Sequence, residues 1–243
     1  MTRALVVCAD DLGRAAGVNR GIVAAHDHGI VTSASLMVRW PAAEAARALA
    51  RARPRLAIGL HVDLGEWVYR SGSWHATYQV VDTGDAGAVR REVARQLAAF
   101  ERIVGGPPTH LDSHQHVHRA EPVASVVRAA GERLGVPVRG GTPGIESRGD
   151  FHGQTGRGEP YPEGIAVESL LELIRTLPPG ITELCTHPGD APDLDSPYRE
   201  ERAIEVRVLC DARVRAVLER ERVELLSFAD VPARLRAASP RPP

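Results

Sequence analysis

Histidines crowd one short stretch of this sequence, THLDSHQHVH at residues 109–118, which holds four of the ten histidines and one aspartate. These five side chains recur at every second position: His110, Asp112, His114, His116 and His118. Because a β-strand directs alternate side chains to the same face, the spacing predicts that they lie on one side. Imidazoles and a carboxylate without a close cysteine pair are typical of Zn²⁺, Mg²⁺, Mn²⁺ or Fe²⁺ sites with open positions. The stretch therefore indicates a catalytic metal site.

The alternation cannot stay regular to the end of this stretch, because helical periodicity begins near residue 120. We expect His110 and Asp112 deeper in the strand, His114 at its tip, and both His116 and His118 on the turn beyond it. Metal-bound imidazoles usually donate their other N–H to a carboxylate or carbonyl. We therefore interpret Asp112 as an orienting partner and His114 as a ligand.

Two further stretches place acids and a histidine after apolar runs. Asp10 and Asp11 in CADDLG reach one site only if the strand has ended and the chain turns, which Gly13 permits. A bound cation would relieve the repulsion between two close carboxylates. GLHVDLGE contains His61 and Asp63, whereas its Glu66 is either a contributor or a solvated loop residue.

Short apolar runs alternate with longer helical stretches along the chain. The predicted strands are residues 4–9, 33–38, 56–62, 108–114, 136–139, 181–187 and 223–228. The predicted helices cover about 16–29, 42–52, 86–104, 120–134, 166–177 and 198–219. Strand and helix in repeated alternation predict an α/β fold with a parallel sheet, either a doubly wound open sheet or a (β/α) barrel.

Both architectures bind ligands at the carboxyl ends of their strands. The acids and histidines described above lie at such ends, and Arg139 and His187 end the fifth and sixth predicted strands. Ionisable groups at five strand ends of one rim indicate an active site.

Two segments, 67–85 and 140–165, interrupt the alternation. The second is rich in Gly and Pro and has no period, and long loops of this kind are functional or disordered. We interpret it either as a lid over the rim, with Phe151, His152 and Tyr161 as substrate contacts, or as a plain surface loop. A frayed tail is expected from about residue 236.

The bulk composition is that of a globular protein. The 243 residues suit a single catalytic domain, and a net charge of -1 gives no case for nucleic acid or an anionic membrane. Lysine is absent, which excludes a Lys Schiff base. Three distant cysteines suggest a reducing compartment, and the apolar run at the start is too short for a signal peptide or a membrane span. We therefore expect a cytoplasmic protein.

Five stretches resemble, in order and spacing, the YdjC-like carbohydrate deacetylases, a family that includes chitooligosaccharide deacetylase and a hopanoid-associated relative. The stretches are VVCADDLGRAAGVNRGI, VTSASLMV, LAIGLHVDLGE, PTHLDSHQHVH and TELCTHPGD. The resemblance implies an irregular seven-stranded (β/α) barrel, TIM-like and related to polysaccharide deacetylases. It also implies one divalent metal ion, Zn²⁺ or Mg²⁺, held by the residues matching Asp11, His61 and His114, with the residue matching Asp10 as general base.

Two departures from the family pattern concern the pocket. Leu12 stands where the family often has an aromatic residue, and GEWVYRSGSWHATY replaces a usually polar loop after GLHVDL. This second segment is expected to help shape the substrate pocket.

The expected reaction removes the acetyl group from an N-acetylated amino sugar. A metal lowers the pKa of its bound water toward about 7, and Asp10 takes a proton from that water. Arg139 is a candidate oxyanion donor, with a salt bridge to Asp112 or Asp10 as the alternative. His187 is the first candidate for the acid that protonates the leaving amine, and His116 is the second. The alternative reading of His187 is a capping residue before Pro188.

Two other functions remain open from the residues alone. Asp10 and Asp11 could serve a glycoside hydrolase, although this leaves the histidines unexplained. A non-catalytic carbohydrate-binding relative would keep the metal ligands and lose the base. A homodimer is a possible assembly.

Overall fold

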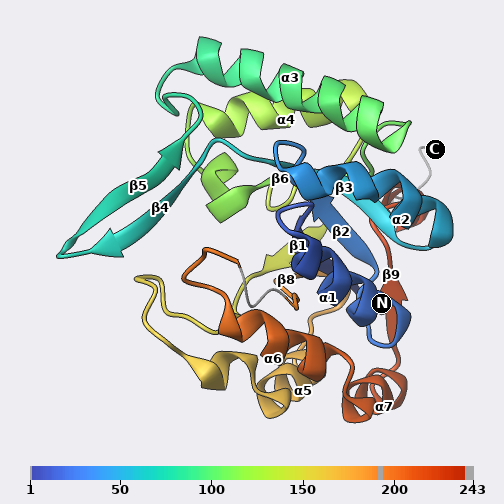
Figure 1. The fold of residues 1–243 in the computed structure, drawn as a ribbon. Coiled ribbons are helices and arrows are strands. Elements are labelled where there is room, and N and C mark those ends of the chain that lie inside the picture. Colours follow the sequence, from blue (N-terminus) through green and yellow to red (C-terminus); the bar gives the residue numbers. More distant parts are fainter. Residues whose placement is uncertain (1, 191–193, 239–243) are drawn as a thin grey trace.

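Seven parallel strands form one curled sheet in the computed structural model, which describes residues 2–190 and 194–238. In sheet order, the six strands along the main path are β6 (Leu111–Ser113), β3 (Ala57–Val62), β2 (Ser33–Leu36), β1 (Arg3–Leu12), β8 (Gly180–Thr186) and β7 (Ile145–Arg148). The seventh, β9 (Val223–Leu226), pairs with the first half of β1. The sheet curls into a half-barrel, which confirms the predicted α/β class and strand number (Figure 1).

The central strand β1 has three neighbours because it is long. β8 pairs with it from Arg3 to Ala9, and the other edge is shared between β9, from Arg3 to Val6, and β2, from Cys8 onward. Ala4, Val6 and Cys8 pack with Phe228 and Leu226 in one buried cluster. The alternate residues Leu5, Val7 and Ala9 belong to the larger cluster, which also contains helix residues. Asp10 lies two residues after Cys8, so its side chain is on the same face of the strand as those of Ala4, Val6 and Cys8.

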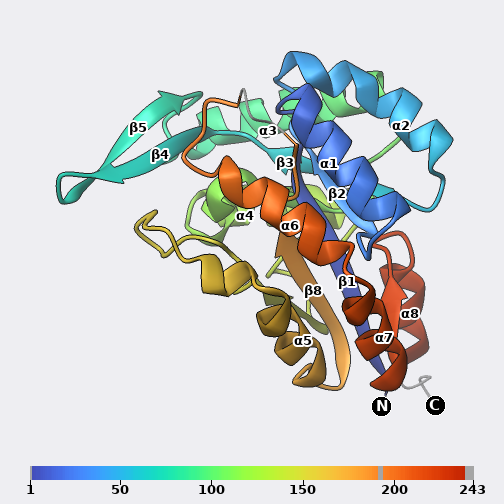
Figure 2. The same ribbon diagram turned by 60° about the horizontal axis from the view of Figure 1, so that its bottom comes forward.

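Helices cover the outside of the sheet. They are α1 (Ala16–Asp27), α2 (Ala46–Ala52), α3 (Ala86–Val104), α4 (Val123–Leu134), α5 (Val167–Arg175), α6 (Glu200–Leu209), α7 (Ala212–Arg220) and α8 (Val231–Ala238), with short 3₁₀ segments η1 (Pro41–Ala45), η2 (His114–Arg119) and η3 (Pro162–Ile165). Figure 1 shows α3 and α4 above the sheet and α5, α6 and α7 below it. Figure 2 shows α1 beside α6.

The clearest predicted helix, 86–104, is confirmed to the residue as α3. Asp85 accepts hydrogen bonds from the backbone N–H groups of Gly87 and Ala88, and Gly105 ends the helix at a φ of 91°. The predicted helix 198–219 is instead two helices, because Asp211 accepts a hydrogen bond from the Arg213 N–H and starts α7.

The predicted strand 136–139 is reduced to one bridge between Leu111 and Val138. Pro137 has no N–H, so it pairs with the Leu111 N–H through its carbonyl only. The expected loop 140–165 contains β7 and η3. Residues 236–238 form the end of α8, and the remainder of the segment expected to fray lies outside the described residues.

The other expected loop, 67–85, is mostly a β-hairpin of β4 (Gly65–Arg70) and β5 (Ser73–Gln79). Ser71 and Gly72 both have positive φ, 51° and 86°, which is the geometry of a two-residue hairpin turn that follows the strand twist. Figure 1 shows the hairpin standing out from the body of the molecule, away from the sheet.

Within the described ranges, every helix is too short or too polar to cross a membrane.

Candidate active site

A bulge in β1 directs two adjacent carboxylates, Asp10 and Asp11, toward the same site. The pairing of β1 with β2 shifts register between Ala9 and Leu12, and Asp11 has a φ of 67°. This left-handed residue brings Asp11 to the same side as Asp10, although neighbouring strand residues normally face opposite ways. The turn therefore lies at Asp11 itself, and the strand continues to Leu12 instead of ending before it.

Residues from two strands and from the turn after a third strand converge beside this bulge. His61 lies near the end of β3, and His114 follows β6 directly. Asp11 Oδ1 is 3.4 Å from His61 Nε2 and 3.1 Å from His114 Nδ1. One donor atom from each of the three residues lies within 4.8 Å of the others, a spacing that could hold a metal ion.

Each of the two imidazoles is held from behind by a carboxylate. His61 donates from Nδ1 to Asp112 Oδ1 at 2.7 Å, which leaves Nε2 facing Asp11. Glu66 Oε2 lies 3.3 Å from His114 Nε2. A carboxylate on the far nitrogen of a ligating imidazole fixes its orientation and raises its basicity. The orienting position predicted for Asp112 matches this contact.

An arginine lies behind each of these carboxylates. Arg139 Nη2 is 2.8 Å from Asp112 Oδ2, and Arg14 Nη2 is 2.7 Å from Glu66 Oε2. The remaining ligand candidate, Asp11, accepts a hydrogen bond on Oδ2 from Arg202 in α6, so that its Oδ1 faces the two imidazoles.

The formal charges of this network favour a dication. Its five carboxylates belong to Asp10, Asp11, Glu66, Asp112 and Glu183, and the guanidinium groups paired with them belong to Arg14, Arg139 and Arg202. Two negative charges are left over, which a divalent cation would balance. The pKa of His61 points the same way: burial opposes protonation, but Asp112 and then Asp10 outweigh it and raise this pKa to about 10. A metal ion bound to His61 would take the place of this proton, because a ligating imidazole is neutral.

Arg139 is fully engaged by acids and does not reach the pocket. Its Nη1 and Nη2 donate to the two oxygens of Asp10 at 2.6 and 2.7 Å, and its Nε donates to Glu183 at 2.5 Å. Only 2% of Arg139 is exposed. The salt-bridge alternative to an oxyanion donor is therefore the one found. Burial opposes ionisation of Asp10, but Arg139 and then His61 outweigh it, so that the pKa of Asp10 falls to about 2.

His187 lies beside Asp10 in the same pocket. Its Nε2 is 4.0 Å from Asp10 Oδ2, and its Nδ1, which has no hydrogen-bond partner, is 3.9 Å from Glu205 Oε1. Burial lowers the pKa of His187 well below its usual value, although Asp10 opposes the effect. Burial also lowers the pKa of His116, to about 3. Both shifts favour the neutral imidazole.

The other residues named from the sequence are distributed between core, pocket and surface. His110 is fully buried and stacks on Phe228, and His118 lies under the rim with its Nδ1 2.6 Å from Ser113 Oγ. Phe151 packs in the hydrophobic core at 1% exposure, so it does not face a substrate. Tyr161 is 47% exposed and lies outside the pocket lining.

Sequence patterns did not identify several residues of the site. Glu183 faces Arg139 from the middle of a buried strand, Arg202 comes from a helix, and Ser35 donates to Asp112 at 2.6 Å. A charged residue inside an apolar strand, as in ITELCTH, is the one clue that could have identified Glu183. Arg202 is one of 30 arginines in the sequence, and nothing in its neighbourhood distinguishes it.

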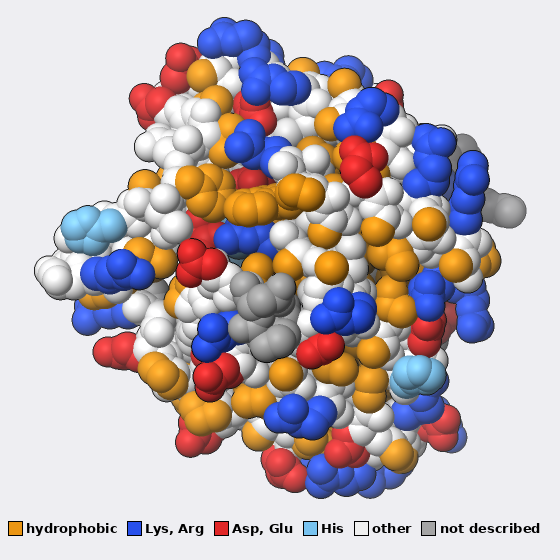
Figure 3. Space-filling model, in the orientation of Figure 1, with side chains coloured by type: hydrophobic (Ala, Val, Ile, Leu, Met, Phe, Trp, Pro, Cys, Tyr) orange, Lys and Arg blue, Asp and Glu red, His pale blue; other side chains and the backbone are white. Residues whose placement is uncertain are grey.

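Asp11 and His114, two of the three converging residues, line a pocket of about 640 Å³. Asp10, Asp11, His114, His116 and His187 line its base, and its walls come from the β4–β5 hairpin, residues 149–158 and residues 196–202. In Figure 3, which has the orientation of Figure 1, the hairpin projects at the left edge of the molecule. The volume is typical of a small-molecule site.

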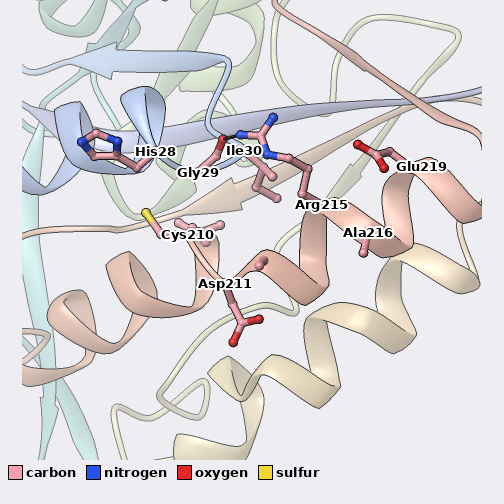
Figure 4. A pocket seen from close by; sticks show the side chains of 10 residues that line it. His28, Gly29, Ile30, Cys210, Asp211, Arg215, Ala216 and Glu219 are labelled. Carbon is pink, nitrogen blue, oxygen red and sulfur yellow. Dashed lines mark hydrogen bonds between the residues drawn. The ribbon is translucent and has the colours of Figure 1, made fainter.

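A smaller cavity of about 330 Å³ lies elsewhere, between the end of α1 and the start of α7 (Figure 4). Arg215 crosses it and donates to the Gly29 carbonyl at 2.6 Å, and Cys210 donates to the Ala24 carbonyl. Both side chains thus make hydrogen bonds to the backbone of the chain itself. We therefore do not interpret this cavity as a ligand site.

Solved structures with the same fold include two from bacteria. A protein of Enterococcus faecalis V583 superimposes with a TM-score of 0.76 at 24% identity, covering 95% of this chain and 99% of that one. A polysaccharide deacetylase from Bacillus cereus has a TM-score of 0.54 at 11% identity, covering 93% and 91%. The predicted relation in fold to polysaccharide deacetylases is confirmed.

Sequence comparison extends over nearly the whole chain. The carbohydrate deacetylase of Geobacillus stearothermophilus is 32% identical over 251 residues, covering 95% of this chain and 98% of that protein. The chitooligosaccharide deacetylase of Serratia marcescens is 29% identical over 263 residues, covering 95% and 100%. The family model described as YdjC-like protein matches residues 4–220. The chain therefore belongs to the YdjC-like family.

Proposed function

We propose that this chain is a metal-dependent hydrolase, a single catalytic domain that removes the N-acetyl group from an amino sugar in an oligosaccharide or glycoconjugate. The observation that carries the proposal is the convergence of Asp11, His61 and His114 within 4.8 Å, with Asp10 beside them on the floor of a pocket. Relatives named carbohydrate and chitooligosaccharide deacetylases support the acetylated sugar as the substrate.

One divalent ion, Zn²⁺ or Mg²⁺, would be held by Asp11, His61 and His114. Oxygen and imidazole donors in this number suit a catalytic ion, because three protein ligands leave room for water and substrate. When bound, such an ion supplies Lewis acidity, which makes water a stronger acid and polarises a carbonyl.

Asp10 acts as the general base. Arg139 binds both of its oxygens and keeps it ionised, so that it can accept a proton from the attacking water. Its Oδ2 also lies 3.9 Å from His61 Nε2, so this carboxylate is next to one of the three residues that would hold the ion. Arg139 therefore positions the base and does not itself contact substrate.

The leaving amine needs a proton, since it departs poorly as an anion. His187 is the candidate donor because its Nε2 lies in the pocket 4.0 Å from Asp10 Oδ2. This gap is too long for a direct hydrogen bond, so a proton from Asp10 would reach His187 through one bridging water before it passes to the amine. His116 also lines the pocket and stays the second candidate. A neutral imidazole suits this role, since it first receives the proton and then delivers it.

A screen for acetate release tests the proposal. The purified protein, incubated with Zn²⁺ or Mg²⁺ and N-acetylated mono- and oligosaccharides, is expected to release acetate, and a chelator is expected to stop the release. New reducing ends without acetate would instead identify a glycoside hydrolase using Asp10 and Asp11. Sugar binding without either product would identify a non-catalytic relative.

A further inference from the structure

The β4–β5 hairpin carries a cluster of aromatic side chains on one face. Trp67 and Tyr69 are two residues apart on β4, and Trp74 on β5 pairs directly with Tyr69. Because strand side chains alternate and paired residues share a face, these three aromatic residues lie on the same side of the hairpin. The ring centroids of Tyr69 and Trp74 are 5.5 Å apart in an edge-to-face arrangement.

This aromatic face belongs to the wall of the active-site pocket. Trp67, Tyr69 and Trp74 line the same cavity of about 640 Å³ as Asp10 and His114. Trp74 is nevertheless 56% exposed. A large aromatic side chain left half in solvent beside a catalytic pocket is available to a ligand.

The hairpin is fixed to the candidate metal site through Gln115. The Gln115 side chain accepts a hydrogen bond from the Trp67 N–H and donates one to the Trp67 carbonyl, both at 2.8 Å. These bonds pair the backbone where the hairpin register shifts, between Glu66 and Trp67. Gln115 directly follows His114, so the aromatic face keeps a defined position relative to the candidate ligand.

The opposite wall adds polar groups. The guanidinium of Arg157 lies over the Tyr69 ring, 5.4 Å from its centroid, and Thr155 and Gln154 line the pocket next to it. A pyranose ring presents an apolar C–H face and an edge of hydroxyl groups. Because Arg157 covers Tyr69, the exposed ring of Trp74 offers the stacking surface, and the polar groups beside it match the hydroxyl edge.

We infer that the aromatic face of the hairpin, centred on Trp74, is a subsite that binds a second sugar ring of the substrate. The inference rests on the proposed deacetylase function. The acetylated unit occupies the floor with Asp10 and His114, and a neighbouring ring stacks on Trp74 at the pocket mouth.

The test compares N-acetylglucosamine, N,N′-diacetylchitobiose and N,N′,N″-triacetylchitotriose in the acetate-release assay. The wild-type protein is expected to have a kcat/KM at least tenfold higher for the two oligosaccharides. Trp74→Ala is expected to reduce this preference at least fivefold, and Trp74→Phe is expected to retain most of it. His75→Ala is the matched control, because His75 pairs with Val68 on the other face of the hairpin and is exposed.

Equal kcat/KM for all three sugars, or an equal effect of Trp74→Ala on each, would overturn the subsite. Direct binding separates this failure from failure of the deacetylase proposal. Calorimetric titration with triacetylchitotriose is expected to show at least a tenfold weaker Kd for Trp74→Ala, even if no sugar releases acetate. Self-association of the wild type that Trp74→Ala abolishes, with unchanged sugar binding, would assign the aromatic face to a second copy of the chain instead.

Discussion

Asp112 accepts a hydrogen bond from His61 Nδ1 at 2.7 Å, and this contact decides which nitrogen of His61 faces Asp11. Asp112 is completely buried and is itself held by Ser35 and Arg139. The imidazole is therefore oriented before any ligand arrives, through a chain of contacts that begins outside the pocket.

Asp112→Asn is expected to weaken metal binding about 10–100-fold, because the amide cannot hold His61 as firmly in one orientation. Calorimetric titration of the metal-free protein with Zn²⁺ measures the change. Asp27→Asn, which alters an exposed carboxylate paired with Arg53, is the control and should leave the affinity unchanged. An unaltered affinity in Asp112→Asn would remove the orienting role.

His114→Ala is expected to lower metal affinity further than Asp112→Asn does, because it removes a donor atom and not only the partner of one. Metal content after dialysis, measured by elemental analysis, provides the readout. His75→Ala, at an exposed hairpin position, serves as the histidine control. Full retention of metal by His114→Ala would mean that another residue is the third ligand.

Asp10→Asn is expected to keep the metal and to lose turnover by about two to four orders of magnitude, which is the usual contribution of a general base. The amide side chain keeps the shape of the carboxylate but cannot accept the proton from water. Acetate release and metal content are measured on the same preparation. Normal turnover by this variant would exclude Asp10 as the base.

Arg139→Met is expected to lower the free energy of unfolding by about 3–5 kcal/mol, because the buried carboxylates of Asp10, Asp112 and Glu183 lose their shared cation. Urea denaturation at pH 7 measures the loss. Arg20→Met breaks an exposed pair with Asp190 and should cost less than about 1 kcal/mol. Equal losses in the two variants would contradict the shared-cation arrangement.

Acidification is expected to destabilise the metal-free protein through His110. Burial lowers the pKa of this imidazole to about 4, whereas an unfolded histidine titrates near about 6.5. Between these values the unfolded state binds the extra proton, so the contribution is complete above about pH 6.5 and is lost as pH falls toward 4. The slope is at most about 1.4 kcal/mol per pH unit.

His110→Gln removes this titration, so its urea stability should fall less steeply between pH 7 and pH 5 than that of the wild type. The comparison concerns the slope and tolerates a constant loss of stability from the substitution. Parallel curves for the two proteins would show that His110 does not carry the proton linkage.

Local pattern predicted the elements where one physical cause dominates. Helix α3 follows from apolar residues at three- and four-residue steps, together with an Asp before it and a Gly after it. The hairpin could also have been found, because Trp67 and Tyr69 alternate before a Ser-Gly pair that suits a two-residue turn. The expectation of a loop over 67–85 is therefore wrong for most of this segment.

The sequence by itself determined that acids and histidines follow the strands, since alternation and strand ends are local properties of the chain. Only the tertiary structure decided which charges meet. Asp11 and Arg202 are 191 residues apart, and Arg139 meets Asp10 across 129 residues. Such contacts depend on strand order, on the φ of 67° at Asp11 and on the packing of α6, and no local pattern encodes them. Burial is likewise a property of the whole fold. It places Phe151 in the hydrophobic core and leaves Trp74 exposed beside the pocket.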